Sequence, residues 1–280
     1  MSWIRKVFDF FLFSSLYISL CAVLMTWQSV YMLQISISND LYWFVFFATI
    51  CSYNFHWYLT PLSQISAERT RWSLQHKNAH LLFYFIGVIG SLVFFYKLRQ
   101  HWFALFFATL LTFLYSAPKI PLPYFRFLKQ VAIGKTIFLT TVWTYVTSML
   151  PVFIASLHFN HAMKWFSASR FFLIYSICIL FDYRDRVDDK QDGIRTLVNY
   201  FDETVVNRLF IFSMMAFVFF TLGLHFSGIP ATRIFIMIIP GIVLASLYRI
   251  SKRSISDYLY YFVLDGLMML SALLMAILPI

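Results

Sequence analysis

Charged residues are scarce in this 280-residue chain: Asp, Glu, Lys and Arg make up 12% of it, whereas 61% is hydrophobic. A soluble globular domain is about 25% charged and about 45–50% apolar. The composition therefore excludes a soluble globule. It also argues against a nucleic-acid-binding protein, because no soluble basic segment with interleaved aromatic residues is present.

Cysteine is also rare. The three cysteines, Cys21, Cys51 and Cys178, lie far apart and inside apolar runs, and none belongs to a C-x-x-C pair. We expect them to be packing residues rather than disulfide partners or metal ligands.

Long apolar runs and aromatic residues are abundant instead. The 34 Phe, 17 Tyr and 8 Trp residues suit lipid-facing surfaces and interfacial belts. Segments of about 17–25 residues, long enough to cross roughly 30 Å of hydrocarbon, lie near 10–33, 41–62, 80–97, 101–117, 131–157, 168–185, 205–225, 231–248 and 258–278. The sequence predicts an all-α polytopic membrane protein with about nine transmembrane helices in a single domain over residues 1–280.

Basic residues predict the orientation of these helices. With the N-terminus placed inside, most of the 22 Lys and Arg residues fall in loops on the cytoplasmic side, as the positive-inside rule requires. We therefore expect a multi-pass protein of the inner or plasma membrane with a cytoplasmic N-terminus. The net charge of +10 would also attract anionic lipid or an anionic substrate to that face.

Acidic residues gather at the cytoplasmic end of the sixth predicted helix. Five of the twelve fall within eleven consecutive positions, at Asp182, Asp185, Asp188, Asp189 and Asp192. On a continuous helix Asp182, Asp185 and Asp189 share roughly a 60° arc, where like charges repel. A Mg²⁺ ion would remove that repulsion. A solvated helix end with surface ion pairs is the alternative explanation.

The segment 182–197, DYRDRVDDKQDGIRTL, resembles the second aspartate-rich motif of the UbiA superfamily of intramembrane prenyltransferases, which reads much like N-x-R-D-x-x-x-D-x-x-x-G-x-R-T-L. The match places Asp185 and Asp189 at the metal-binding aspartates and Asp182 near the Asn of the pattern. Residues 114–119, LYSAPK, resemble the family segment L-Y-S/T-x-P-x-K. The resemblance covers essentially the whole chain and implies a UbiA-like helical bundle.

The first aspartate motif of that family, N-x-x-x-D-x-x-x-D, is degraded here. Asn54 is present at the end of the second predicted helix, but Tyr58 and Leu62 stand where the carboxylates belong. The resemblance implies a metal site made of Asn54 with Asp182, Asp185 and Asp189, and Tyr58 donating to phosphate. Alternatively Glu68 folds back into the site, or the chemistry has been lost.

The implied activity is Mg²⁺-dependent intramembrane transfer, or cyclisation, of a prenyl group from an isoprenoid diphosphate to a lipophilic acceptor that the sequence does not identify. We expect cationic side chains to bind the diphosphate, and the candidates are Arg69, Arg71, Lys119, Arg126, Lys129 and Arg195. One alternative is a catalytically impaired UbiA-like protein that binds an isoprenoid lipid or serves as a membrane partner. A transporter that uses the acidic cluster for ion coupling is another alternative.

Overall fold

The computed structural model describes residues 3–60, 68–117, 133–191 and 196–278. These residues form helices and connecting loops, and no strand occurs among them. Seven helical segments in the described part are long and apolar enough to cross a membrane: Leu16–Leu33, Lys77–Lys97, Lys135–Ile154, His161–Arg184, Glu203–Ser227, Ala231–Ser251 and Leu259–Ile277. The predicted all-α membrane fold is confirmed.

Two further predicted spans, 41–62 and 101–117, also fold as helices. They form α3 (Asp40–Tyr58) and α6 (Trp102–Ser116), which has 15 residues. Neither is among the seven segments identified by length and hydropathy. The total of about nine spans therefore stays a prediction.

The bounds of the other helices follow the apolar runs, with short helices at their ends. In chain order they are α1 (Trp3–Phe13), α2 (Leu16–Leu33), α4 (Glu68–Gln75), α5 (Lys77–Lys97), η2 (Arg99–His101), α8 (Ile133–Thr144), η5 (Tyr145–Met149), α9 (Leu150–Ile154), α10 (His161–Arg184), α11 (Arg186–Gln191), α12 (Leu197–Tyr200), α13 (Glu203–Gly223), η6 (Leu224–Ser227), α14 (Ala231–Ser251), η7 (Leu259–Leu264) and α15 (Asp265–Ile277).

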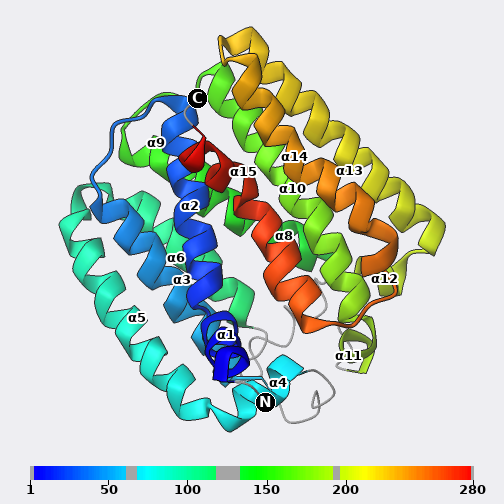
Figure 1. Cartoon of the computed structure of the whole chain (residues 1–280). Coiled ribbons are helices and arrows are strands. Elements are labelled where there is room, and N and C mark those ends of the chain that lie inside the picture. Colours follow the sequence, from blue (N-terminus) through cyan, green and yellow to red (C-terminus); the bar gives the residue numbers. More distant parts are fainter. Residues whose placement is uncertain (1–2, 61–67, 118–132, 192–195, 279–280) are drawn as a thin grey trace.

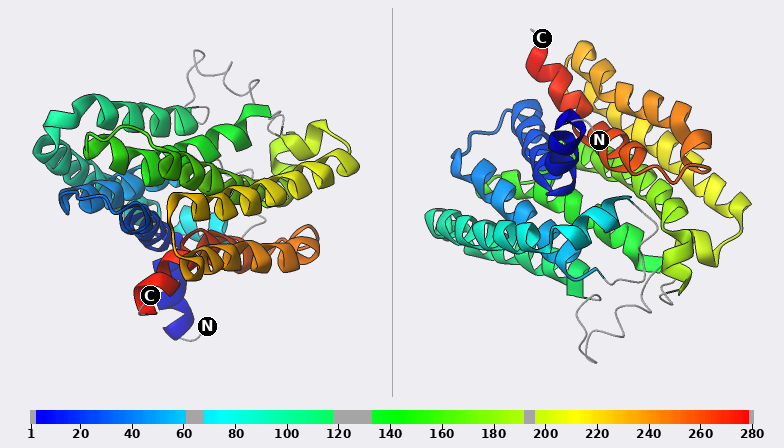
Figure 2. Two further views of the ribbon diagram at one scale, coloured as in Figure 1. Left: turned by 90° about the horizontal axis from the view of Figure 1, so that it is seen from above. Right: turned by 60° about the horizontal axis from the view of Figure 1, so that its bottom comes forward.

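The long helices pack side by side in a closed ring (Figure 1). Helix α2 packs against α3 and α15, α3 against α5 and α6, α6 against α8, and α8 against α10; α10 packs against α13 and α14, and α14 returns to α15. Figure 2 shows the first and last helices on the same side of the molecule. Next to them in the chain, Tyr17 of α2 donates to the Phe262 carbonyl of η7 at 2.8 Å. This contact joins the two ends of the chain.

The first predicted span, 10–33, is two helices rather than one. Ser15 has a left-handed backbone (φ 72°) and separates α1 from α2. A break of this kind leaves helix carbonyls without their usual partners. Asn54 Nδ2 from α3 donates to the Ser14 carbonyl at 3.1 Å, so a neighbouring helix satisfies one of them.

Helices α1, α4 and α11 lie at the same end of the bundle as the N-terminus (Figure 1). Helix α10 stops at Arg184, and after Asp185 the chain resumes as α11, with Asp189 N–H donating to the Asp185 carbonyl at 2.8 Å. The last span begins at this end with a π-helical segment, η7. Such segments are frequent at functional sites.

Candidate active site

The acidic cluster meets helix α8. Asp182 and Asp189 are both buried, with 4% and 5% of their surface exposed. Thr136 Oγ1 donates to Asp182 Oδ2 at 2.6 Å, and Lys135 Nζ donates to the two oxygens of Asp189 at 3.0 and 2.9 Å. Because Lys135 and Thr136 are consecutive, the start of α8 satisfies two carboxylates that lie seven residues apart on α10 and α11.

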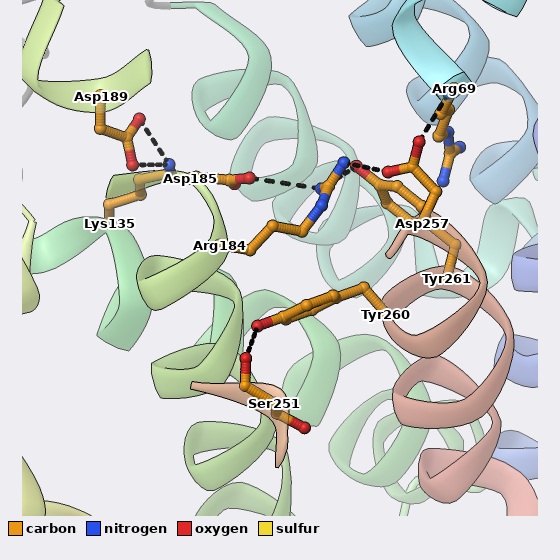
Figure 3. Close-up of polar contacts among 9 residues, drawn as sticks. All are labelled: Arg69, Lys135, Arg184, Asp185, Asp189, Ser251, Asp257, Tyr260 and Tyr261. Atoms are coloured by element: carbon orange, nitrogen blue, oxygen red, sulfur yellow. Dashed lines mark hydrogen bonds and ion pairs between the residues drawn. The ribbon is translucent and has the colours of Figure 1, made fainter. Parts of the chain in front are cut away.

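Asp185 contacts a different cation. It caps α10, and its Oδ1 lies 3.3 Å from Arg184 Nη1. Arg184 also donates to Asp257 Oδ1 at 2.5 Å and to the hydroxyl of Tyr261. Figure 3 shows these side chains as a row across the end of the bundle, from Asp189 and Lys135 to Arg69.

Arg69 is buried at the far end of this row. Its guanidinium carbon lies 4.2 Å from the ring centroid of Trp57 and 3.9 Å from that of Tyr261, and its backbone N–H donates to Asp257 Oδ2 at 2.7 Å. Its Nε and Nη2 have no hydrogen-bond partner within the described part of the chain. Burial lowers the pKa of Arg69, because little water solvates its charge; a nearby anion would offset this loss.

Arg69 and Arg184 both lie against the ring of Tyr261. The Arg184 guanidinium carbon is 4.4 Å from the Tyr261 centroid, and that of Arg69 is 3.9 Å from it. An aromatic face attracts cations, and the Tyr261 ring contacts both guanidinium groups. Arg184 is already paired with Asp185 and Asp257, so Arg69 is the member of the pair whose unpartnered donors suit an anion.

Asn54 lies apart from this row. It is fully buried; its Nδ2 donates to the carbonyls of Ser14 and Ile50, at 3.1 and 2.9 Å, and its Oδ1 accepts from His80 Nδ1 at 2.7 Å. The structure therefore uses this amide to join α1, α3 and α5, and does not bring it into contact with the acidic cluster.

The other predicted residues are more exposed or lie elsewhere. Tyr58 ends α3 with 40% of its surface exposed, and Arg71 is exposed on α4. Glu68 pairs with Arg5 at 3.2 Å on the surface. Leu62 and four predicted phosphate ligands lie outside the described residues; the four ligands are Lys119, Arg126, Lys129 and Arg195.

Comparisons with known proteins identify the fold. No family model matches the sequence, and no curated protein matches it. A solved structure of digeranylgeranylglyceryl phosphate synthase, a UbiA-family prenyltransferase, aligns with 98% of this chain and 99% of its own, with a TM-score of 0.59 and 14% sequence identity. The chain has a UbiA-like fold.

The UbiA-like fold and its second motif imply Mg²⁺, so the donor set must be compared with what that ion requires. Mg²⁺ is usually bound by one or two carboxylates, with waters and substrate phosphate completing an octahedron. No cluster of three His, Cys, Asp or Glu side chains that could hold a metal occurs among the described residues. Lys135 already bonds both oxygens of Asp189, and Arg184 pairs with Asp185. The described carboxylates do not fit a Mg²⁺ site.

Sequence reasoning missed several residues of this candidate site. Lys135 is a single cation within an apolar span, a feature that commonly marks function, and that signal was available. Asp257, Tyr261 and Trp57 had no comparable signal, because they meet Arg69 of α4 only where α3 and the start of the last span, at η7, pack together.

Proposed function

We propose that this protein transfers, or cyclises, a prenyl group from an isoprenoid diphosphate within the membrane, with a lipophilic molecule as acceptor. The observation that carries the proposal is the pair of arginines, Arg69 and Arg184, on the ring of Tyr261 in a UbiA-like bundle. The fold likeness supports the class of reaction. The arginine pair supplies a binding site for the charged end of such a substrate.

The reaction breaks the bond between the allylic carbon and the diphosphate oxygen. Both bonding electrons leave with the diphosphate, and an electron pair of the acceptor, or of an alkene in the same chain, forms the new carbon bond as a proton is released. Fixed cations at the leaving group stabilise the developing negative charge. Arg69 offers the unpartnered donors Nε and Nη2 for this purpose.

Aromatic side chains beside the arginines support the second requirement, which is shelter for the allylic cation. Trp57, Tyr261 and Phe13 surround the Arg69 guanidinium. Because their faces contact that guanidinium, the contribution of these rings to the reaction would be their bulk, which excludes water from the ionising bond. The isoprenoid tail would lie in the apolar bundle or the bilayer, in keeping with the hydrophobic composition.

Additional cations complete the proposed diphosphate site. The candidates are Arg71, Lys119, Arg126, Lys129 and Arg195, with the Tyr58 hydroxyl as a further donor. In the predicted orientation this end of the bundle faces the cytoplasm. The water-soluble diphosphate would be released from the site into that compartment. The resemblance to the second motif implies magnesium dependence, but the described carboxylates do not support it, because Lys135 and Arg184 already pair with Asp189 and Asp185.

Pyrophosphate release tests the proposal directly. Purified protein in detergent is incubated with farnesyl or geranylgeranyl diphosphate and a panel of aromatic and polyol phosphate acceptors. We expect release from wild type and at least a tenfold loss in Arg69→Gln, since one charge-assisted hydrogen bond is worth about 1.5–3 kcal/mol. Arg99→Gln is the matched control, because Arg99 lies just beyond α5 at the opposite end of the bundle. Absence of release with every substrate would refute the proposal.

A second candidate is a UbiA-like protein that binds an isoprenoid lipid without turnover. It is favoured by the engagement of Asn54 and Asp189 in bonds within the chain. This candidate predicts an isoprenoid that co-purifies with the protein and no pyrophosphate release. Mass spectrometry of the purified protein, alongside the release assay, separates the two candidates.

A further inference from the structure

Lys135 occupies an unusual position for a cation. It is the first residue of the apolar segment Lys135–Ile154, and 26% of its side chain is exposed. Its Nζ binds both oxygens of Asp189, at 3.0 and 2.9 Å, and only 7% of the Asp189 side chain is exposed. A buried ionised carboxylate requires a counter-charge. Here the counter-charge comes from the chain itself.

Two further carboxylates of the cluster are also satisfied from within the chain. Asp182 accepts from Thr136 and Asp185 from Arg184. Asp182 bonds to Thr136, the neighbour of Lys135 in the chain, and the Asp185 carbonyl accepts from the N–H of Asp189. One ammonium therefore sits among three carboxylates, in the place where sequence reasoning put a divalent cation.

A metal ion and this ammonium compete for the same oxygens. Two cations about 4 Å apart repel strongly near a protein surface, and Mg²⁺ loses its water shell reluctantly. Binding a metal at Asp189 would therefore require the Lys135 ammonium to move away from Asp189. The ammonium would then lose the three carboxylates that stabilise its charge.

We infer that the Lys135 ammonium replaces the divalent cation at this acidic cluster, and that the diphosphate is held by guanidinium groups instead of a protein-bound metal. The inference rests on the proposed function for its substrate, but its central claim concerns only metal binding. The Lys135–Asp189 pair keeps the ends of α8 and α11 together. Arg184 and Arg69, at the other end of the row, then face the anion.

Equilibrium dialysis against Mn²⁺, which binds the same oxygen ligands as Mg²⁺, tests the inference. It is performed on the detergent-solubilised full chain with and without inorganic pyrophosphate, so that a metal requiring the anion is also detected. Five proteins are compared: wild type, Lys135→Met, Lys135→Arg, Asp189→Asn and the double variant Lys135→Met with Asp189→Asn. Thermal unfolding in the same detergent identifies any variant that does not fold.

We expect wild type and Lys135→Arg to bind no Mn²⁺ that depends on Asp189. Lys135→Met removes the ammonium at similar side-chain length, and should raise Mn²⁺ affinity by about tenfold or more because the repulsion is gone. Adding Asp189→Asn to Lys135→Met should abolish that gain. Should Lys135→Met not fold, Lys135→Gln takes its place.

Two results would overturn the inference. One is Mn²⁺ binding by wild type that is lost in Asp189→Asn; the other is a folded Lys135→Met that gains no affinity. Failure of the proposed function is distinguishable, because it would appear as no pyrophosphate release, with Mg²⁺ or with EDTA, whatever the dialysis shows. If both hold, release from wild type should persist in EDTA.

Discussion

Asp257 Oδ1 accepts a hydrogen bond from Arg184 Nη2 at 2.5 Å, and both side chains are almost fully buried. The pair joins the end of α10 to the residues that precede the last span. The second oxygen of Asp257 accepts from the backbone N–H of Arg69. One carboxylate therefore sets the positions of both arginines on which the proposed function depends.

Asp257→Asn should destabilise the protein and slow the reaction. Removing one partner of a buried ion pair costs about 3–5 kcal/mol, and Arg184 would lose its fixed position. Thermal unfolding and pyrophosphate release measure the two effects. Asp40→Asn is the control, because its pair with Lys97 is solvent-exposed and worth about 1 kcal/mol or less. Equal Tm values for the two variants would contradict this account of Asp257.

Tyr261 should act through its ring more than through its hydroxyl. Tyr261→Phe keeps the face that contacts Arg69 and Arg184 but loses the bond from Arg184, whereas Tyr261→Leu loses both. Each buried cation–π contact is worth up to about 2 kcal/mol. We expect Tyr261→Leu to raise KM for the diphosphate about tenfold and Tyr261→Phe to raise it less. Equal KM values for the two variants would argue against a role for the ring.

Asn54 should behave as a structural residue. Asn54→Leu leaves the Ser14 carbonyl and the His80 ring without their partner, and each buried unsatisfied group costs about 1–3 kcal/mol. The variant should unfold at a lower temperature. Its kcat per folded molecule and its Mg²⁺ response should match wild type. A changed Mg²⁺ response at unchanged Tm would instead support the metal role that the sequence predicts.

Arg170 provides a test far from the acidic cluster. It is buried in α10, where it donates to Gln28 at 2.9 Å and to Ser271 at 3.1 Å. Gln28→Leu leaves this intramembrane charge with fewer partners and should lower stability by about 1–3 kcal/mol. Adding Arg170→Met should restore stability, since an apolar replacement of a buried polar pair is often neutral. Thermal unfolding of Gln28→Leu, of Arg170→Met and of the double variant measures the coupling between the two residues. Stability losses that simply add would contradict this coupling.

Cysteine labelling can test the predicted orientation. Gln100 and Ser256 are exposed at opposite ends of the bundle. With a cytoplasmic N-terminus, an impermeant maleimide should label Gln100→Cys in intact cells and Ser256→Cys only after permeabilisation. Wild type, with Cys21 and Cys178 buried and Cys51 half-buried, gives the background. The reverse pattern would invert the orientation.

The fold was predictable because bilayer thickness sets the length of an apolar run, and a run such as 205–225 is visible without packing information. Local breaks were less visible. Ser15 has a left-handed backbone, which interrupts an apolar segment. The interruption is tolerated because Asn54 Nδ2 donates to the Ser14 carbonyl, which the break leaves without its usual helical partner.

The candidate site was predictable only where charge is dense along the chain. Asp182, Asp185 and Asp189 were identified because like charges at helical spacing need a partner. Their partner Lys135 lies on another helix, so spacing could not assign it. Asp257 and Tyr261 follow an ordinary loop, and their contacts with Arg69 and Arg184 arise only in the assembled bundle.

The π-helical segment Leu259–Leu264 sets the register of the last helix. A π-turn contains one residue more than an α-turn, so deleting one residue there would rotate everything beyond it by about 100° relative to Tyr261. Ser271 would then turn away from Gln28 and Arg170. The arginine pair beside Tyr261 and the Arg170 contacts deeper in the bundle therefore depend on the same helical register, and a change of length in this segment would disturb both.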